Sequence, residues 1–75
     1  MSDITNYENL ANAIILQAAK DYRMALKCLK ANPKNRTALA DKDEIERFFR
    51  SGWFTVLTSV DGEVLIRSMT MEVDA

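Results

Sequence analysis

The stretch that decides the fold is residues 4–31, ITNYENLANAIILQAAKDYRMALKCLKA, which contain neither glycine nor proline. Apolar side chains recur at every third or fourth position: Tyr7, Ala11, Ile14, Ala18, Tyr22, Ala25 and Leu29. This period is typical of one face of an α-helix. Because Ile15, Ala19 and Leu26 widen the apolar face, the sequence predicts a long N-terminal helix that packs against two neighbours.

Both ends of this helix carry boundary signals. Ser2 or Asp3 can accept hydrogen bonds from the first free backbone N–H groups and so cap the N-terminus. Proline disfavours helical geometry in the residue before it, so Asn32-Pro33 predicts the C-terminus. After Pro33, residues 33–40 fit either a short helical turn, which Asn32 could cap, or a loop.

A second helix is predicted in the middle of the chain. Asp41-Lys42-Asp43-Glu44 has the spacing of a capping box, which favours a helix that starts there, runs to Arg50 and ends at Ser51-Gly52. Three of its apolar residues are expected to face inward: Ile45, Phe48 and Phe49. Two pairs at i,i+4 are expected to form ion pairs on the outer side: Asp43 with Arg47, and Glu46 with Arg50.

The last quarter of the chain fits two structures. WFTVLT and VDGEVLI could be two strands joined at Asp61-Gly62, a strong hairpin signal. They could also be a short helix capped by Ser51 and a final helix, capped by Asp61, that runs to about Val73. We favour the helices because an isolated hairpin is barely stable and nothing upstream supplies a third strand. The expected fold is an all-α bundle of three to four helices, with an α+β fold carrying a C-terminal β-hairpin as the alternative.

Composition limits the size and chemistry of the protein. With 75 residues, 48% of them hydrophobic, residues 1–75 fit one small domain. A single cysteine, Cys28, cannot form an internal disulfide, and without histidine the usual zinc sites cannot be assembled. A domain of this size buries little surface, so the sequence is also compatible with a homo-oligomer, in which subunits bury further surface against one another.

The sequence also bears on location. The first 12 residues carry acids and no basic cluster ahead of an apolar run, which is unlike a secretory signal. The longest stretches without a charge, Asn9–Ala19 and Ser51–Val60, have 11 and 10 residues and are too short to cross a bilayer. We therefore expect a cytoplasmic protein without membrane contact.

A basic strip stands out against a net charge of −1. Residues 20–36 hold six basic side chains and one acid. Four of the basic residues are spaced 3, 4 and 3 along the first helix: Lys20, Arg23, Lys27 and Lys30. They share one helix face, which could bind phosphates or an acidic protein surface, or could simply be the solvated back of an amphipathic helix. No known nucleic-acid motif accompanies the strip, so binding to DNA or RNA would be electrostatic.

Four of the six aromatic residues fall within residues 48–54: Phe48, Phe49, Trp53 and Phe54. A small chain needs large side chains to build a core, so burial is the first explanation. The second is an interface, because Trp and Arg contribute strongly to binding when a partner buries them. Arg47, Arg50 and Trp53 therefore join the basic strip as candidate partner-binding residues.

The sequence offers no convincing catalytic or metal site. The acids in the middle of the chain lack the third ligand position and the glycine of a calcium loop, and capping and ion pairing explain them more simply. The nucleophile candidates, Cys28, Ser51 and Ser59, have no evident base nearby in sequence. We expect no metal, no cofactor and no enzymatic activity.

Residues 44–54, EIERFFRSGWF, with the VLT and VDGE that follow them, resemble small phage-type proteins encoded in prophages and other mobile elements of Gram-positive bacteria, especially Clostridia. The similarity includes residues 12–23, NAIILQAAKDYR, and so spans most of the chain. Members of this family usually continue after Asp-Gly-Glu with a helical tail rich in Leu, Arg, Lys and Glu. The resemblance thus implies a helical C-terminus. Residues 68–71, SMTM, depart from that pattern, so we expect the last helix to fray or be remodelled there.

The resemblance implies a small accessory protein that binds and inhibits a host component, such as a CRISPR effector or another defence nuclease. Inhibitors of host defence, including anti-CRISPR proteins, are common among such products because covering a binding surface needs no catalytic machinery. The alternative is a phage nucleic-acid-associated or regulatory protein that binds phosphates through the basic strip. This expectation concerns genomic setting and does not come from individual residues.

Overall fold

The computed structural model describes the backbone of residues 2–74 and the side chains of residues 8–74. Within this range the chain forms four helices: α1 (Ser2–Ala31), α2 (Arg36–Phe49), α3 (Gly52–Leu57) and α4 (Gly62–Asp74). The described residues contain no strand. The prediction of a small all-α bundle with a long N-terminal helix is confirmed, and the alternative of a hairpin at Asp61-Gly62 is wrong.

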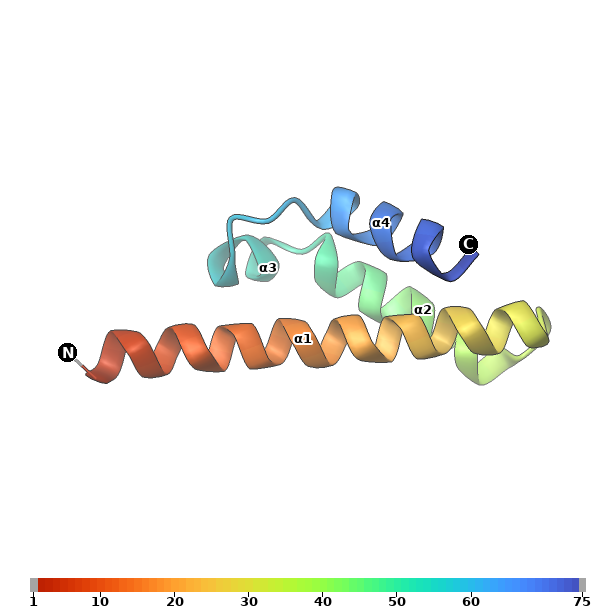
Figure 1. The fold of residues 1–75 in the computed structure, drawn as a ribbon, viewed down its shortest axis with the longest axis horizontal. Coiled ribbons are helices and arrows are strands. Elements are labelled where there is room, and N and C mark those ends of the chain that lie inside the picture. Colours follow the sequence, from red (N-terminus) through yellow and green to blue (C-terminus); the bar gives the residue numbers. More distant parts are fainter. Residues whose placement is uncertain (1, 75) are drawn as a thin grey trace.

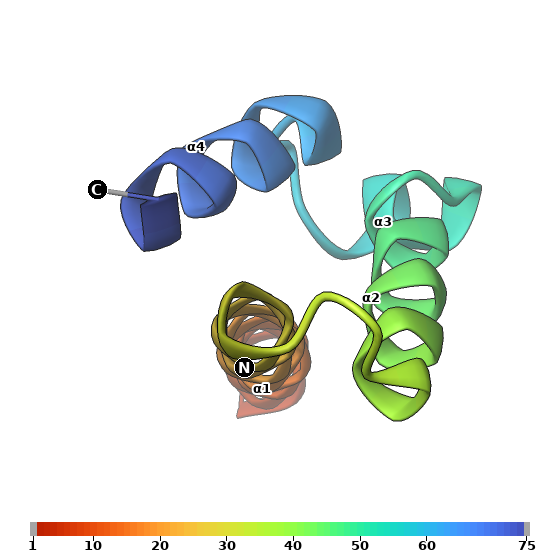
Figure 2. The ribbon, with the colours of Figure 1, turned by 90° about the vertical axis from the view of Figure 1, so that its right-hand side faces the viewer.

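α1 forms the long axis of a molecule that measures 47 × 21 × 20 Å (Figure 1). α2 runs back along α1, α3 follows it, and α4 returns in the direction of α1. Seen end-on, α2 and α4 flank α1 at two different places around its axis (Figure 2). The prediction that α1 packs against two neighbours is therefore confirmed. The N-terminal part of α1 extends past the other helices (Figure 1).

The predicted end of α1 is confirmed. The helix stops at Ala31, directly before Asn32-Pro33. The Oδ1 atom of Asn32 then accepts a hydrogen bond from the N–H of Lys34 at 3.2 Å, which closes the turn that leads to α2. The caps proposed at Ser2 and Asp3 would use side chains outside the described ones.

The start of α2 differs from the prediction. Its N-cap is Asn35, whose Oδ1 accepts from the N–H of Ala38 at 3.0 Å, and the helix begins at Arg36. Asp41 consequently lies inside a helix and does not open a capping box. The earlier start is favoured because it adds backbone hydrogen bonds and buries Ala38. Asn35 was not among the caps expected from the sequence, which were Asn32 and Asp41.

The two C-terminal helices begin at the predicted caps. Ser51 Oγ accepts from the N–H of Phe54 at 3.2 Å, and Asp61 Oδ1 accepts from the N–H of Glu63 at 2.9 Å. α4 then continues through residues 68–71 to Asp74, so the fraying or remodelling expected there does not occur. Burial of Met69 in the core offsets the weak helix propensity of this segment.

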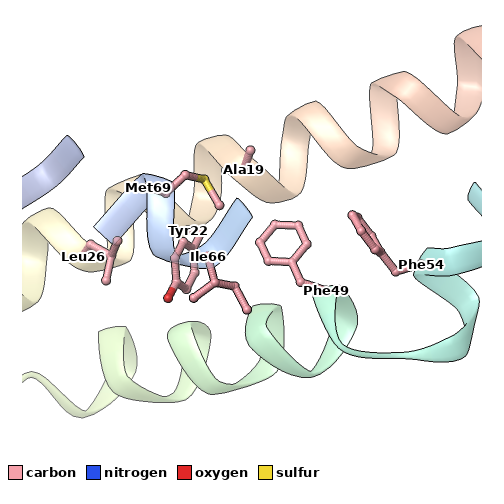
Figure 3. Close-up of a cluster of buried hydrophobic side chains, with 7 residues drawn as sticks. All are labelled: Ala19, Tyr22, Leu26, Phe49, Phe54, Ile66 and Met69. Carbon is pink, nitrogen blue, oxygen red and sulfur yellow. The ribbon is translucent and has the colours of Figure 1, made fainter. Parts of the chain in front are cut away.

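The core lies where all four helices meet (Figure 3). Seven buried side chains form it: Ala19, Tyr22, Leu26, Phe49, Phe54, Ile66 and Met69. The ring of Phe49 makes edge-to-face contacts with Tyr22 and Phe54, at centroid separations of 5.9 and 5.5 Å. Of the residues of α2 expected to face inward, Phe49 is buried, while Ile45 and Phe48 are half-buried against this core.

Gly62 lets the start of α4 lie directly against the end of α2. A Cβ atom at this position would overlap the carbonyl oxygen of Phe49 and would lie 2.9 Å from its carbonyl carbon. The other glycine, Gly52, faces open space. The close approach of α4 to the end of α2 therefore depends on the missing side chain of Gly62.

Candidate functional site

The basic strip of α1 is divided by its contacts with α4. Lys20 and Lys27 are exposed, and no ion pair joins either to another described residue. Arg23 Nε forms an ion pair with Glu72 Oε2 at 3.2 Å, and Lys30 Nζ donates to the carbonyl oxygen of Val73 at 3.0 Å. Two of the four basic side chains thus hold the last turn of α4, whose free carbonyl groups attract positive charge.

A polar network links α1, α2 and α4 beside the core. The Tyr22 hydroxyl, fixed by a fully buried ring, donates to Glu46 Oε2 at 2.6 Å, and Lys42 Nζ reaches the same oxygen at 2.8 Å. Arg50 Nη1 lies 3.3 Å from Glu46 Oε1, which confirms the predicted Glu46–Arg50 pair. Arg50 Nε also pairs with Glu63 at the start of α4.

The network shifts the pKa values of its members in opposite directions. Burial, together with the hydrogen bond to Glu46, raises the pKa of Tyr22 to about 12. Burial alone would raise the pKa of Glu46, but the hydrogen bonds from Lys42 and Tyr22 outweigh it and lower that pKa. Folding therefore favours a neutral tyrosine beside a charged glutamate.

The arginines proposed as binding residues are placed differently. Arg50 is occupied by Glu46 and Glu63 and fixes the joint between α2 and α4. Arg47 is exposed on the outer side of α2. Its predicted pair with Asp43 does not form, because no described ion pair includes either residue. Of the two arginines, Arg47 is thus the one that forms no ion pair with another described residue.

The aromatic region separates into core and surface. Phe49 and Phe54 are buried, and Phe48 packs against both at ring separations of 5.7 and 5.6 Å. Trp53, by contrast, is 59% exposed. Consecutive residues of a helix point about 100° apart, so turning Phe54 into the core directs Trp53 away from it. Burial explains three of the four clustered aromatic residues and leaves Trp53 on the surface.

The acidic and nucleophilic candidates are dispersed. The four acids of α2 do not form one cluster: Asp41 and Glu44 face the space between α1 and α2, Glu46 contacts Tyr22 and Lys42, and Asp43 is exposed elsewhere on the helix. Within the described part of the chain, no three carboxylate or thiol groups are arranged to hold a metal ion. Cys28 is half-buried in α1. None of these residues assembles with others into a recognisable reaction centre.

A groove between α1 and α2 is a surface that the sequence did not reveal. It has a volume of about 690 Å³. Nine residues line it: Ala13, Ile14, Gln17, Ala18, Asp21, Asp41, Glu44, Ile45 and Phe48. One hint was available, because Ile45 and Phe48 were expected to face inward and Asp41 and Glu44 are close to them in sequence. Only the packing of α2 on α1 brings these residues beside Ile14, which is 38% exposed rather than buried as the apolar stripe predicted.

Comparisons with protein-family models, with curated proteins and with solved structures found no match to this chain. Across residues 2–74, no helix has both the length and the apolar character that a membrane span requires.

Proposed function

We propose that this chain is a non-enzymatic accessory protein of a phage or mobile element, which binds a host component such as a CRISPR effector and inhibits it. The observation that carries the binding role is the contrast between Trp53, 59% exposed, and its neighbour Phe54, 1% exposed. Burying the Phe54 ring fixes α3 in place. Trp53 is consequently presented on a rigid helix, where it offers a large apolar contact area at a low cost in conformational entropy.

Further apolar surface lies close to Trp53 in the chain. Val56, three residues further along α3, is exposed, as is Val60 in the turn that follows. Neighbouring apolar side chains on a protein surface often mark a contact site for another protein. They extend the surface around Trp53 that a partner could cover.

A protein partner is better supported than a nucleic acid. Arg23 and Lys30 are engaged by α4, and Arg50 lies between two glutamates. Of the four basic residues that share the α1 face, this leaves Lys20 and Lys27 exposed and without a contact to α4, too few free cations on this face for strong phosphate binding. Replacing both with Glu should therefore leave capture of the partner unchanged after nuclease treatment, whereas a nucleic-acid-associated protein would lose retention on DNA.

The test compares Trp53→Ala with the wild type in capture of proteins from nuclease-treated host lysate. The matched control is Met71→Ala, because Met71 on α4 is 66% exposed. We expect circular dichroism to show that all three proteins fold alike. The wild type and the control should retain a common partner, which Trp53→Ala should lose. Equal capture by all three, or unfolding of Trp53→Ala, would contradict the proposal.

A further inference from the structure

The groove between α1 and α2 has an apolar floor that is fixed before any partner binds. Ile45 and Phe48 contribute to the floor and at the same time pack against the core. Phe48 is held by its contacts with the rings of Phe49 and Phe54. A preformed apolar floor reduces the entropy lost on binding, because its side chains are already ordered.

The apolar floor continues along α1 beyond the end of α2. Leu10 lies four residues before Ile14, on the same helix face, and is 61% exposed. From Leu10 to Asp21 the helix rises about 16 Å, which is roughly three turns. The groove with this extension is therefore a linear surface, whose length and apolar character suit one side of a short helix.

The charges around the groove have one sign. Asp21, Asp41 and Glu44 line it, and no Lys or Arg is among its lining residues. The single lysine of α2, Lys42, is paired with Glu46 outside the groove. The carboxylates thus lack a cation within the groove, and an occupant that carries cations would supply the missing counter-charge.

The acidic and apolar parts of the groove lie toward opposite ends. Because α2 runs antiparallel to α1 (Figure 1), Asp41 is at the end near Asp21, and Phe48 is at the end near Ala13. The groove therefore suits a segment with apolar side chains along one face and cations concentrated toward one end. A second copy of the groove would bring three further carboxylates and no lysine or arginine from its lining, which disfavours a symmetric dimer through this face.

We propose that the groove binds a basic amphipathic helix of about three turns belonging to a partner protein. This inference rests on the proposed binding role but uses a surface separate from Trp53. It names the kind of segment that the partner would present: apolar residues spaced at i, i+4 and i+7, flanked by Lys or Arg. The apolar contacts would supply affinity, and the carboxylates would select for positive charge.

The probe is a synthetic peptide of about 14 residues with Leu at i, i+4, i+7 and i+11 and Lys at flanking positions. Two control peptides have the same Leu pattern with Glu in place of Lys, and the same composition in scrambled order. Calorimetric titration should show saturable one-to-one binding of the basic amphipathic peptide alone. Equal binding of the scrambled peptide would reduce the interaction to non-specific attraction and overturn the proposal.

Variants of the groove test the contribution of its carboxylates and the contribution of its apolar floor to peptide binding. The double variant Asp41→Asn, Glu44→Gln should bind the peptide about tenfold more weakly at low salt, because two counter-charges are lost. Asp43→Asn, on α2 but outside the groove, is the matched control and should bind like the wild type. Ile14→Asp should abolish binding. Ala13→Lys, at an exposed position, should also abolish binding. It replaces Ile14→Asp as the test if that variant does not fold.

Two further outcomes would overturn the proposal: peptide affinity unchanged in the groove variants, or a groove already occupied by a second copy. The latter would appear in sedimentation as a mass that rises with concentration and returns to that of a monomer in Ile14→Asp. Trp53→Ala should still bind the peptide. The experiments can therefore contradict the proposal for the groove without contradicting the proposal for Trp53, and the reverse.

Discussion

The two flanks of α1 use their charged residues differently. On the flank that faces α4, Arg23 pairs with Glu72 and Lys30 donates to the carbonyl group of Val73, so these two cations are bound within the molecule. On the flank that faces the groove, the acids lack cationic partners and an apolar floor is left open. The basic strip, the most prominent charge pattern of the sequence, is thus partly used inside the molecule, while a less conspicuous set of acids faces an open surface.

This difference has a simple origin in the lengths of the helices. α1 has 30 residues, whereas α2 has 14 and α4 has 13. The shorter helices cover mainly the C-terminal half of α1 (Figure 1). Arg23 and Lys30, which α4 reaches, find partners within the chain, whereas the carboxylates that line the groove beside α2 pair with no cation among the described residues. Exposed apolar residues of α1 such as Leu10 and Ile14 therefore lie where the covering helices end.

The largest expected effect separates the closed core from the open groove. Phe49→Ala should lower the free energy of unfolding by about 3–5 kcal/mol, because it removes a buried ring and leaves a cavity between α1, α2 and α3. Ile14→Ala should cost less than about 1.5 kcal/mol, because its side chain is already partly in water. Urea unfolding followed by circular dichroism measures both. Similar losses would mean that the groove floor belongs to the core.

A smaller effect is expected at the joint between α2 and α4. Gly62→Ala should destabilise the fold by about 1–3 kcal/mol, because the added Cβ would overlap the carbonyl group of Phe49. Gly52→Ala is the control at the start of α3, where the added Cβ would meet nothing. It should be neutral or stabilise by about 0.4–1 kcal/mol. The melting temperatures of the two variants should therefore shift in opposite directions, or the decrease for Gly62→Ala should be clearly larger than any change for Gly52→Ala.

The smallest expected effect concerns the polar network. Tyr22→Phe removes the hydrogen bond to the charged Glu46 and should cost about 1.5 kcal/mol near neutral pH. The pKa of Tyr22 is raised to about 12, above the value of 10.0 of an ordinary tyrosine. The stabilisation is therefore complete below pH 10 and is lost as the pH rises from 10 toward about 12.

Unfolding measurements on Tyr22→Phe and the wild type, repeated at several pH values, check this dependence. The stability difference between the two proteins should shrink as the pH rises above 10. A difference that stays constant to pH 12 would contradict the role given to the hydrogen bond. At the acid end, the lowered pKa of Glu46 predicts that its contribution is lost as the pH falls below the ordinary value of 4.5.

Much of the fold could be predicted from local patterns. The end of α1 at Asn32-Pro33 and the caps at Ser51 and Asp61 depend on hydrogen bonds within a few residues, and all three are confirmed. The predicted start of α2 at Asp41 was wrong because Asn35, which had not been considered as a cap, is also a residue type that caps helices. Choosing between them required knowledge of what Ala38 packs against.

Contacts between distant residues could not be predicted. Tyr22 and Glu46 are 24 positions apart, and Arg23 and Glu72 are 49 positions apart. No periodicity connects such pairs, because their approach depends on how whole helices pack. For the same reason, the partial use of the basic strip by α4 and the groove between α1 and α2 emerge only in the folded chain.

The amino-acid sequence by itself determined that this protein is helical, where most of its helices begin and end, and that large aromatic rings build its core. These properties follow from dihedral preferences, caps and apolar periods, which act over a few residues. Tertiary structure alone decided which charges are neutralised within the molecule, that Trp53 lies outside while Phe54 lies inside, and that three acids surround an apolar groove. These properties depend on the relative placement of helices, and burial and electrostatic pairing act through space irrespective of distance along the chain.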